Sequence, residues 1–148
     1  MLDSQLVDPR TQGMARRQSA ALPVLGSGDE LRVVLVTSRE TRRWVVPKGW
    51  IEPREAPHRS AAREAFEEAG LAGEADPDPI GVFAYSKRMA RGVVLPIEVL
   101  VFRFRVTDLL KEWPERRERE RQLFTPVEAA SLVREPQLAA LLRALSPA

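Results

Sequence analysis

The stretch GWIEPREAPHRSAAREAFEEAGL, residues 49–71, constrains the fold of this chain more than any other part of it. Its second half, Pro57–Ala69, predicts a helix that starts at a proline and ends before Gly70, the residue type that most readily takes the left-handed conformation of a helix stop. Four apolar residues recur at the spacing of a single helix face, which we expect to pack on a core: Ala62, Ala65, Phe66 and Ala69.

The opposite face of this predicted helix carries three glutamates. Glu64, Glu67 and Glu68 fall within about 100° of arc at 3.6 residues per turn. Carboxylates stacked in this way repel one another by roughly a few tenths of a kcal/mol for each pair. A helix built for stability alone would place lysine or arginine among them, so we interpret this face as a metal site.

Composition restricts the chemistry to carboxylates, basic side chains and a metal. The 148 residues include no cysteine and a single histidine, His58, which excludes disulfides, thiolate nucleophiles and zinc sites built from Cys or several His. A Ser–His–Asp triad would need His58, which has no nucleophile motif near it. The remaining hard oxygen ligands favour Mg²⁺, with Mn²⁺ as the alternative.

Hydropathy indicates a protein without a membrane partner. No apolar run approaches the roughly 18 residues that cross a bilayer. Residues 1–13 are acidic and polar and lack the apolar region of a secretory signal. We therefore expect a cytoplasmic location.

The order of predicted elements indicates one α+β domain over residues 18–148, a mixed sheet with helices on its faces. Residues 1–17 are expected to form a loose arm, and Met14 is an alternative start. Predicted strands are 18–25, 31–37, 44–46, 80–86, 93–106 and 122–124, with loops at 72–79 and 108–121.

Two helices are predicted after the last strand. Residues 125–128 have the spacing of a capping box with proline at the first helical position, so a helix should run from there to about residue 134. Pro136 opens the second helix, in which four leucines predict a core stripe: Leu138, Leu141, Leu142 and Leu145.

The spacing within residues 49–71 resembles the signature of the Nudix hydrolase family, the Nudix box. The matching positions are Gly49, Glu55, Arg63, Glu64, Glu67, Glu68 and Gly70, followed by Leu71. Seven such fixed positions would match by chance on the order of once in 10⁵ sequences. The resemblance implies a Nudix-type α/β/α sandwich with a mixed β-sheet and a loop–helix–loop catalytic motif.

The resemblance also implies an activity, namely hydrolysis of a nucleoside diphosphate linked to another moiety or of a related pyrophosphate. It implies that Glu64, Glu67 and Glu68 are the catalytic and Mg²⁺-binding carboxylates, and that the main-chain carbonyl of Lys48 or Gly49 adds a ligand. A carboxylate would act as general base, with Glu67 or Glu68 ranked ahead of Glu64.

Other box positions are expected to be structural. The resemblance implies an ion pair between Glu55 and Arg63 that ties the loop to the helix. From the residues alone, Gly49 allows close backbone approach to a ligand and Gly70 caps the helix. A fourth acid would complete the site, and the candidates are Glu98, Glu115, Glu118 and Glu120, each of which has a solvated carboxylate as its alternative interpretation.

Within the family, the chain most resembles the diphosphoinositol polyphosphate and diadenosine polyphosphate phosphohydrolases. The segments RRWVVPKGWIEPREAP, SRETRRW and EWPERRERERQLFTPVEA carry this resemblance. Such substrates are very anionic, and residues expected to clamp them, or else to be ordinary exposed side chains, are Arg16, Arg17, Ser38, Arg39, Arg43, Lys87, Arg88 and Arg91. Tyr85 and Trp50 could stack on a base or belong to the packing.

Two other functions fit the sequence less well. One is a Nudix hydrolase of damaged nucleotides or of the 5′-pyrophosphate of RNA, which a base-specific pocket would reveal. The other is a Nudix-fold nucleotide-binding module without activity, for which loss of box acids is expected, whereas all are present here. The expected partner is a small phosphorylated substrate rather than nucleic acid, and the chain is expected to be a monomer or homodimer.

Overall fold

The computed structural model describes residues 16–145 of the chain. An eight-stranded mixed sheet forms its centre, with the order β3-β2-β1-β7-β5, while β4 pairs with β1, β6 with β7 and β8 with β2. The strands are β1 (Arg16–Leu25), β2 (Arg32–Thr37), β3 (Trp44–Val45), β4 (Lys48–Trp50), β5 (Leu71–Ala75), β6 (Gly81–Arg88), β7 (Val94–Leu109) and β8 (Arg121–Phe124). Only β1 and β7 run parallel among the paired strands described; the other pairs are antiparallel.

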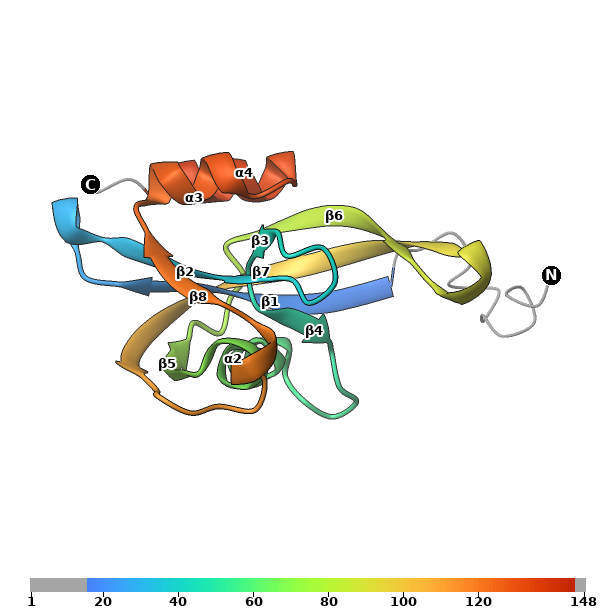
Figure 1. Cartoon of the computed structure of the whole chain (residues 1–148), viewed down its shortest axis with the longest axis horizontal. Helices are drawn as coiled ribbons and strands as arrows, with labels where there is room; N and C mark the ends of the chain where they lie inside the picture. Colours follow the sequence, from blue (N-terminus) through green and yellow to red (C-terminus); the bar gives the residue numbers. More distant parts are fainter. Residues whose placement is uncertain (1–15, 146–148) are drawn as a thin grey trace.

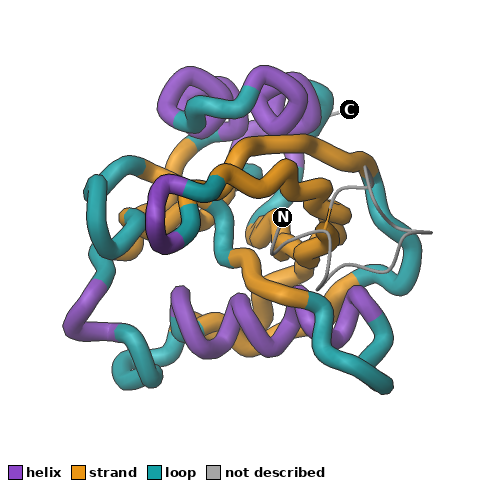
Figure 2. Tube along the Cα trace, turned by 90° about the vertical axis from the view of Figure 1, so that its right-hand side faces the viewer, coloured by secondary structure: helices purple, strands orange, loops and turns teal. Residues whose placement is uncertain are grey.

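The helices lie on opposite faces of this sheet. Helix α2 (Pro57–Ala69) covers one face, and α3 (Pro126–Leu132) and α4 (Pro136–Arg143) cover the other (Figures 1 and 2). The expected α+β class and α/β/α sandwich are confirmed. Among residues 16–145, no helix has both the length and the apolar character needed to cross a bilayer.

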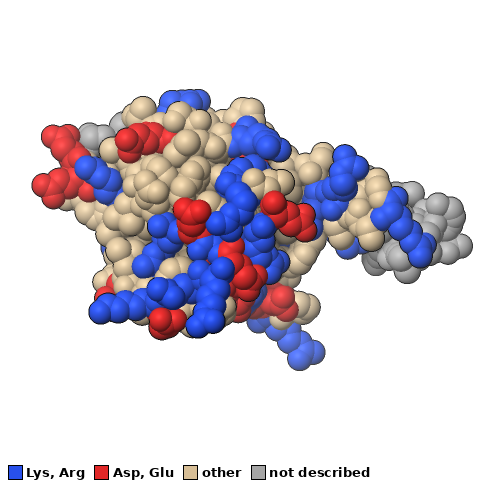
Figure 3. Space-filling view, in the orientation of Figure 1, with Lys and Arg blue, Asp and Glu red and all other residues tan. Residues whose placement is uncertain are grey.

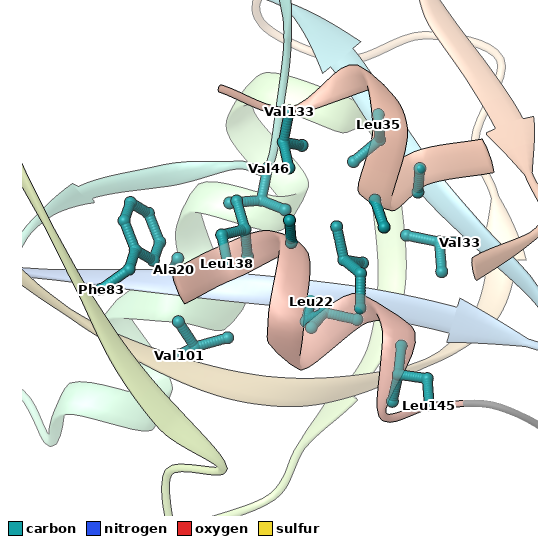
Figure 4. Close-up of a cluster of buried hydrophobic side chains, with 14 of the residues drawn as sticks. Ala20, Leu22, Val33, Leu35, Val46, Phe83, Val101, Val133, Leu138 and Leu145 are labelled. Carbon is teal, nitrogen blue, oxygen red and sulfur yellow. The ribbon is translucent and has the colours of Figure 1, made fainter. Parts of the chain in front are cut away.

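Strand β7 serves both layers of the core, as its nearly continuous apolar sequence predicts. Alternate residues point to opposite faces of a strand. Ile97, Val99 and Val101 therefore pack in the cluster beneath α3 and α4, which is drawn in Figure 4. Phe102 and Phe104 pack in the second cluster, beneath α2. This strand joins the two halves of the core.

Local sequence signals set the ends of the helices as expected. Pro57 is at the start of α2, and Gly70 stops it with a φ of 64°. In α3 the capping box is formed, with Glu128 N donating to Thr125 Oγ1 at 3.1 Å and Thr125 N donating to Glu128 Oε1 at 2.9 Å. The leucine stripe of α4 lies in the core, with Leu141 only partly buried.

The structure corrects the loop predicted at 72–79. Residues Leu71–Ala75 form β5, which pairs with the end of β7 and has a register shift between Ala72 and Gly73. Strand β7 continues to Leu109, beyond the predicted end at residue 106, and so offers an edge on which even a Gly-containing segment can pair. Strand β1 begins at Arg16, and residues 1–15 of the predicted arm, including Met14, lie outside the described residues.

The apolar face of α2 also differs from the prediction. Phe66 is 44% exposed, whereas Ala61, Ala65 and Ala69 are fully buried. The helix is thus rotated so that a row of methyl groups, rather than the larger phenylalanine, lies against the sheet. Small side chains permit a close approach of helix and sheet. This rotation draws the neighbouring glutamates inward.

Candidate functional site

Two of the three glutamates of α2 come together inside the protein. Glu64 and Glu68 lie one turn apart beside the buried alanine row, and each is only 9% exposed. Burial raises the pKa of Glu64, although Glu68 and Arg63 oppose the shift. Burial likewise raises the pKa of Glu68, to about 8. This carboxylate pair therefore keeps a proton near neutral pH, because burying an uncompensated charge is costly.

The backbone of β4 packs directly against the carboxylate pair. The main-chain N–H of Lys48 donates to Glu68 Oε1 at 3.2 Å. A Cβ atom on Gly49 would overlap the carboxylate of Glu64. The glycine is required here for space, since its backbone approaches a glutamate of the site itself. The sequence anticipated the close approach but expected a ligand as the neighbour.

Arg63 links the loop before α2 to the carboxylates. Its Nη2 lies 3.1 Å from Glu55 Oε1, and Ser60 Oγ donates to the same oxygen at 2.6 Å. Hydrogen bonds from Arg63 and Ser60 lower the pKa of Glu55. Arg63 Nη1 donates to Glu64 Oε2 at 2.9 Å. One guanidinium thus fixes both the loop and a carboxylate of the pair.

The third glutamate of α2 stands apart from the pair. Glu67 has a side chain that is 38% exposed, and its Oε1 lies 3.7 Å from Arg63 Nη1. In the part of the chain that the structure describes, no three acidic or histidine side chains are close enough to hold a metal ion. The residues present nevertheless fit a hard cation, because two buried carboxylates that retain a proton offer oxygen ligands whose charge a divalent ion would compensate.

A distant segment, residues 110–121, holds the C-terminal end of α2. Every carbonyl from residue 67 to residue 70 accepts a hydrogen bond from this 110–121 segment. The donors are Glu115 N to Glu67 O at 3.1 Å, Trp113 Nε1 to Glu68 O at 3.0 Å, Arg121 Nη1 to Ala69 O at 2.9 Å and to Gly70 O at 3.3 Å, and Leu110 N to Gly70 O at 2.9 Å. The last carbonyls of a helix need such external donors.

Trp113 and Arg121 also fill the space around the helix stop. The ring of Trp113 lies so close to Gly70 that a Cβ atom there would overlap it. The guanidinium of Arg121 stacks on the same ring, 4.2 Å from its centroid. Neither residue was predicted from the sequence to belong to the site, because a run dense in charge indicates a solvated loop. The one available signal was a tryptophan inside that run.

Arg119 is a third residue of this segment that the sequence did not single out. Its side chain is only 8% exposed. Nε donates to Glu115 Oε1 at 2.7 Å, and Nη1 donates to the Thr37 carbonyl at 3.0 Å. Nη2 lies 3.6 Å from Glu68 Oε2. The 110–121 segment therefore brings a buried positive charge to the carboxylate pair.

The candidates for a fourth acid are all paired with arginine. The pairs are Glu98 with Arg17 at 2.9 Å, Glu115 with Arg119 at 2.7 Å, Glu118 with Arg39 at 3.1 Å and Glu120 with Arg42 at 3.1 Å. Of these four acids, Glu115 is the one whose arginine partner, Arg119, also lies close to Glu68. Its link to Glu68 runs through Arg119.

The candidate substrate-binding residues lie in several different places. Arg43 pairs with the buried Glu135 at 3.0 Å, and Ser38 Oγ shares a hydrogen bond with Thr41 Oγ1 at 2.7 Å. Lys87 and Arg88 end β6, and Arg91 lies in the turn before β7, on the hairpin that protrudes at the right of Figure 1. Arg16 and Arg17 open β1. Lys and Arg side chains gather along this hairpin and across the lower middle of the face in Figure 3.

Tyr85 and Lys48 form a contact beside the carboxylate pair. Lys48 Nζ lies over the Tyr85 ring, 4.9 Å from its centroid. Burial lowers the pKa of Lys48, while Glu68 and Glu135 oppose that shift. The Tyr85 hydroxyl donates to Gln18 Oε1 at 2.8 Å, and burial raises its pKa to about 12. Trp50, at the end of β4, is 36% exposed.

These features define a class of protein: an α/β/α sandwich whose loop–helix segment holds a buried carboxylate pair against the sheet. The sequence profile of the NUDIX domain matches residues 15–145. The chain belongs to the NUDIX family.

Named relatives and solved structures agree with this assignment. The chain is 36% identical over 112 residues to Nudix hydrolase 12, mitochondrial, of Arabidopsis thaliana. The aligned residues cover 72% of this chain and 54% of that protein. The chain is 35% identical over 100 residues to diphosphoinositol polyphosphate phosphohydrolase 2 of Rattus norvegicus, covering 67% and 51%. The chain spans about half the length of these curated relatives. The structure of C. elegans Ap4A hydrolase superposes with a TM-score of 0.64 and 17% identity, covering 88% of this chain and 95% of that one, and this likeness shows the fold alone.

Proposed function

We propose that this chain is a hydrolase of phosphoanhydride bonds that depends on a divalent cation, Mg²⁺ with Mn²⁺ as a substitute. The observation that carries the proposal is the buried pair of Glu64 and Glu68, packed against the backbone of Lys48 and Gly49. Two carboxylates that approach each other inside a protein are unfavourable for stability alone, and a cation between them would relieve the conflict. Its NUDIX membership supports the same activity.

The residues of the site have separate tasks in the proposed reaction. Glu64 and Glu68 would hold the cation, with Glu67 and a main-chain carbonyl of Lys48 or Gly49 as further ligands. When bound, the cation neutralises phosphate oxygens and lowers the pKa of the attacking water. The Lys48 N–H orients Glu68, and Arg63 orients Glu64. Glu67 or Glu68 would accept the proton of that water.

For the substrate, we propose a highly phosphorylated molecule, either a diphosphoinositol polyphosphate or a dinucleoside polyphosphate. Positive groups lie near the carboxylate pair: Arg63 donates to Glu64, Arg119 lies 3.6 Å from Glu68, and the charge of Lys48 acts on Glu68. Several cations close to the cleaved bond suit a substrate with many phosphates. The relative from Rattus norvegicus carries the name of a diphosphoinositol polyphosphate phosphohydrolase.

The Tyr85 ring favours this substrate class over one recognised by its base. Lys48 Nζ already covers one face of the ring, and the hydroxyl is bound to Gln18. A base stacked on Tyr85 would have to displace a cation from that face. A phosphate beside Lys48 would instead gain a charge-assisted contact.

A substrate panel tests the proposal. With Mg²⁺ present, the panel contains diphosphoinositol polyphosphates, diadenosine polyphosphates, oxidised and ordinary nucleoside triphosphates and RNA with a 5′-triphosphate, and products are separated by ion exchange. We expect hydrolysis of the first two classes and a loss of at least a hundredfold in Glu68→Gln. Glu74→Gln is the matched control, because Glu74 is exposed and outside the box. Equal activity of Glu68→Gln and wild type would contradict the assignment.

The cytoplasmic location stays a prediction, since the relative from Arabidopsis thaliana is named as mitochondrial. The monomeric or homodimeric state also stays a prediction, and light scattering of the purified chain would measure it.

A further inference from the structure

Arg119 lies outside the box sequence, yet its guanidinium reaches a box carboxylate. Its three nitrogens face three different groups: Nε faces Glu115, Nη1 faces the carbonyl of Thr37, and Nη2 faces Glu68. Two of these contacts are short hydrogen bonds, and the side chain is buried. The guanidinium is planar, so fixing Nε and Nη1 also fixes the direction of Nη2. The third nitrogen is therefore aimed at Glu68.

Glu68 is consequently held from two sides. Its Oε1 accepts a hydrogen bond from the Lys48 N–H, and its Oε2 lies 3.6 Å from Arg119 Nη2. The last torsion of a glutamate side chain is broad, so the hydrogen bond from the Lys48 N–H fixes one carboxylate oxygen and leaves the other to be placed by its neighbours, Glu64 and Arg119. A fixed positive charge near the second oxygen restricts its position. At 3.6 Å the contact acts through charge and not as a hydrogen bond, which leaves Oε2 able to bind another group.

We propose that Arg119 is a positioning residue that directs Glu68 toward the cation and that Glu115 serves as its anchor. The inference rests on the proposed function, because it assigns to Glu68 the task of binding the cation. Glu115, a candidate fourth acid from the sequence, thereby acts on the site through Arg119.

The direction in which the affinity for Mn²⁺ changes in Arg119→Ala distinguishes a positioning role from simple electrostatic repulsion. Removing a positive charge beside a cation site strengthens cation binding if the charge only repels the cation. Removing a positioning residue weakens binding, because Glu68 turns away. We expect Arg119→Ala to raise the dissociation constant of Mn²⁺ at least threefold, followed through the electron paramagnetic resonance signal of free Mn²⁺. This readout requires no substrate.

Kinetics with the preferred substrate provide a second readout. At saturating cation we expect Arg119→Ala to lower kcat at least tenfold and to change KM less than twofold. Arg119→Lys keeps the charge but not the planar fork, and it should fall between wild type and Arg119→Ala. Glu115→Gln should change kcat in the same direction by a smaller factor. Arg117→Ala is the matched control, because Arg117 is exposed and lies on the same segment.

Three results would overturn the proposal. Tighter Mn²⁺ binding in Arg119→Ala would mean that Arg119 acts only by electrostatic repulsion of the cation, and unchanged binding would mean that its role is structural. A raised KM with unchanged kcat would assign Arg119 to the substrate. If Arg119→Ala has unchanged activity per folded molecule but a lower Tm by circular dichroism, Arg119 has only a structural role. Should Arg119→Ala fail to fold, Arg119→Lys and Glu115→Gln decide by the same criteria.

The failure of the proposed function gives a different result. Wild type that binds Mn²⁺ but hydrolyses no substrate in the panel would contradict the proposed activity, while the Mn²⁺ comparison would still decide for or against Arg119. Wild type that binds no Mn²⁺ would overturn both proposals.

Discussion

The two ends of α2 are held by different parts of the chain. At the N-terminal half, Ser60 and Arg63 both contact Glu55, and all three belong to the box. At the C-terminal end, Trp113 and Arg121 donate to the last carbonyls from 45 and 52 residues away. Each end also has an arginine that reaches the carboxylate pair. Arg63 contacts Glu64, and Arg119 contacts Glu68.

This difference shows which parts of the site are encoded by nearby residues and which depend on the tertiary fold. A local motif can encode the N-terminal half, because its partners are at most eight residues apart and share the helix or its loop. The C-terminal end depends on the sheet, since β7 and β8 bracket the 110–121 segment and bring it to the helix. The site is therefore built by a motif at one end and by the tertiary fold at the other.

The largest effect is expected where β4 packs against Glu64, in Gly49→Ala. Its methyl group would overlap the Glu64 carboxylate, so either β4 or the glutamate must move. A shift of about 1 Å at a catalytic group can cost on the order of a hundredfold in rate. We expect kcat to fall by at least about a hundredfold, measured on the preferred substrate at saturating Mg²⁺. Near-normal kcat would show that the backbone of β4 does not fix the carboxylate pair.

An intermediate effect is expected at the C-terminal end, in Gly70→Ala. The residue has a φ of 64°, and its added methyl group would overlap the Trp113 ring. Left-handed strain costs about 1 to 2 kcal/mol, and the overlap adds to it. We expect the free energy of unfolding to fall by about 2 kcal/mol or more in urea denaturation.

A double-mutant cycle separates the two causes at Gly70. Trp113→Ala removes the overlap but leaves the strained φ, so the Gly70→Ala change should cost less in the Trp113→Ala background. Additive effects would mean that the ring does not restrict this position.

The sequence predicts the N-terminal half of the site better than the C-terminal end for a physical reason. Helix Pro57–Ala69, its stop at Gly70 and the capping box at Thr125 follow from local backbone chemistry, and the structure has all three. The rotation of α2 does not follow, because alanine and phenylalanine satisfy the same periodicity and only packing on the sheet decides which of them is buried. Phe66 was assigned to the wrong face for this reason.

Long-range contacts were the other part beyond prediction. Arg119 and Arg121 belong to a run with many arginines and glutamates, in which sequence alone does not distinguish one arginine from another. Burial distinguishes them, since Arg119 is 8% exposed whereas Arg116 is 49% exposed. The strand at Leu71–Ala75 was missed because Gly73 and Glu74 break the apolar pattern of a strand, and β7 supplies the pairing.

The pH dependence of stability without metal compares the two ends most directly. Arg63 and Ser60 lower the pKa of Glu55 below its unfolded value, so Glu55 stabilises the fold at higher pH, and this contribution is lost as pH falls through the folded pKa. Burial raises the pKa of Glu68 to about 8, so its contribution is complete below about pH 4.5 and is lost as pH rises toward 8. The two ends therefore respond to pH with opposite sign.

Urea denaturation in EDTA at pH 4, 6 and 8 measures this contrast. We expect Glu55→Gln to reduce the pH dependence of stability on the acid side by about 1 kcal/mol, the size of one hydrogen bond. Glu68→Gln should reduce the pH dependence between pH 5 and 8 by more, because burial moves the pKa of Glu68 further from its ordinary value than hydrogen bonding moves that of Glu55. Mg²⁺ should restore the stability of wild type at pH 8 but not that of Glu68→Gln, because the cation compensates the charge that burial disfavours. A wild-type stability that rises from pH 6 to pH 8, with Glu68→Gln rising in parallel, would mean that Glu68 ionises without cost and that the carboxylate pair retains no proton near neutral pH.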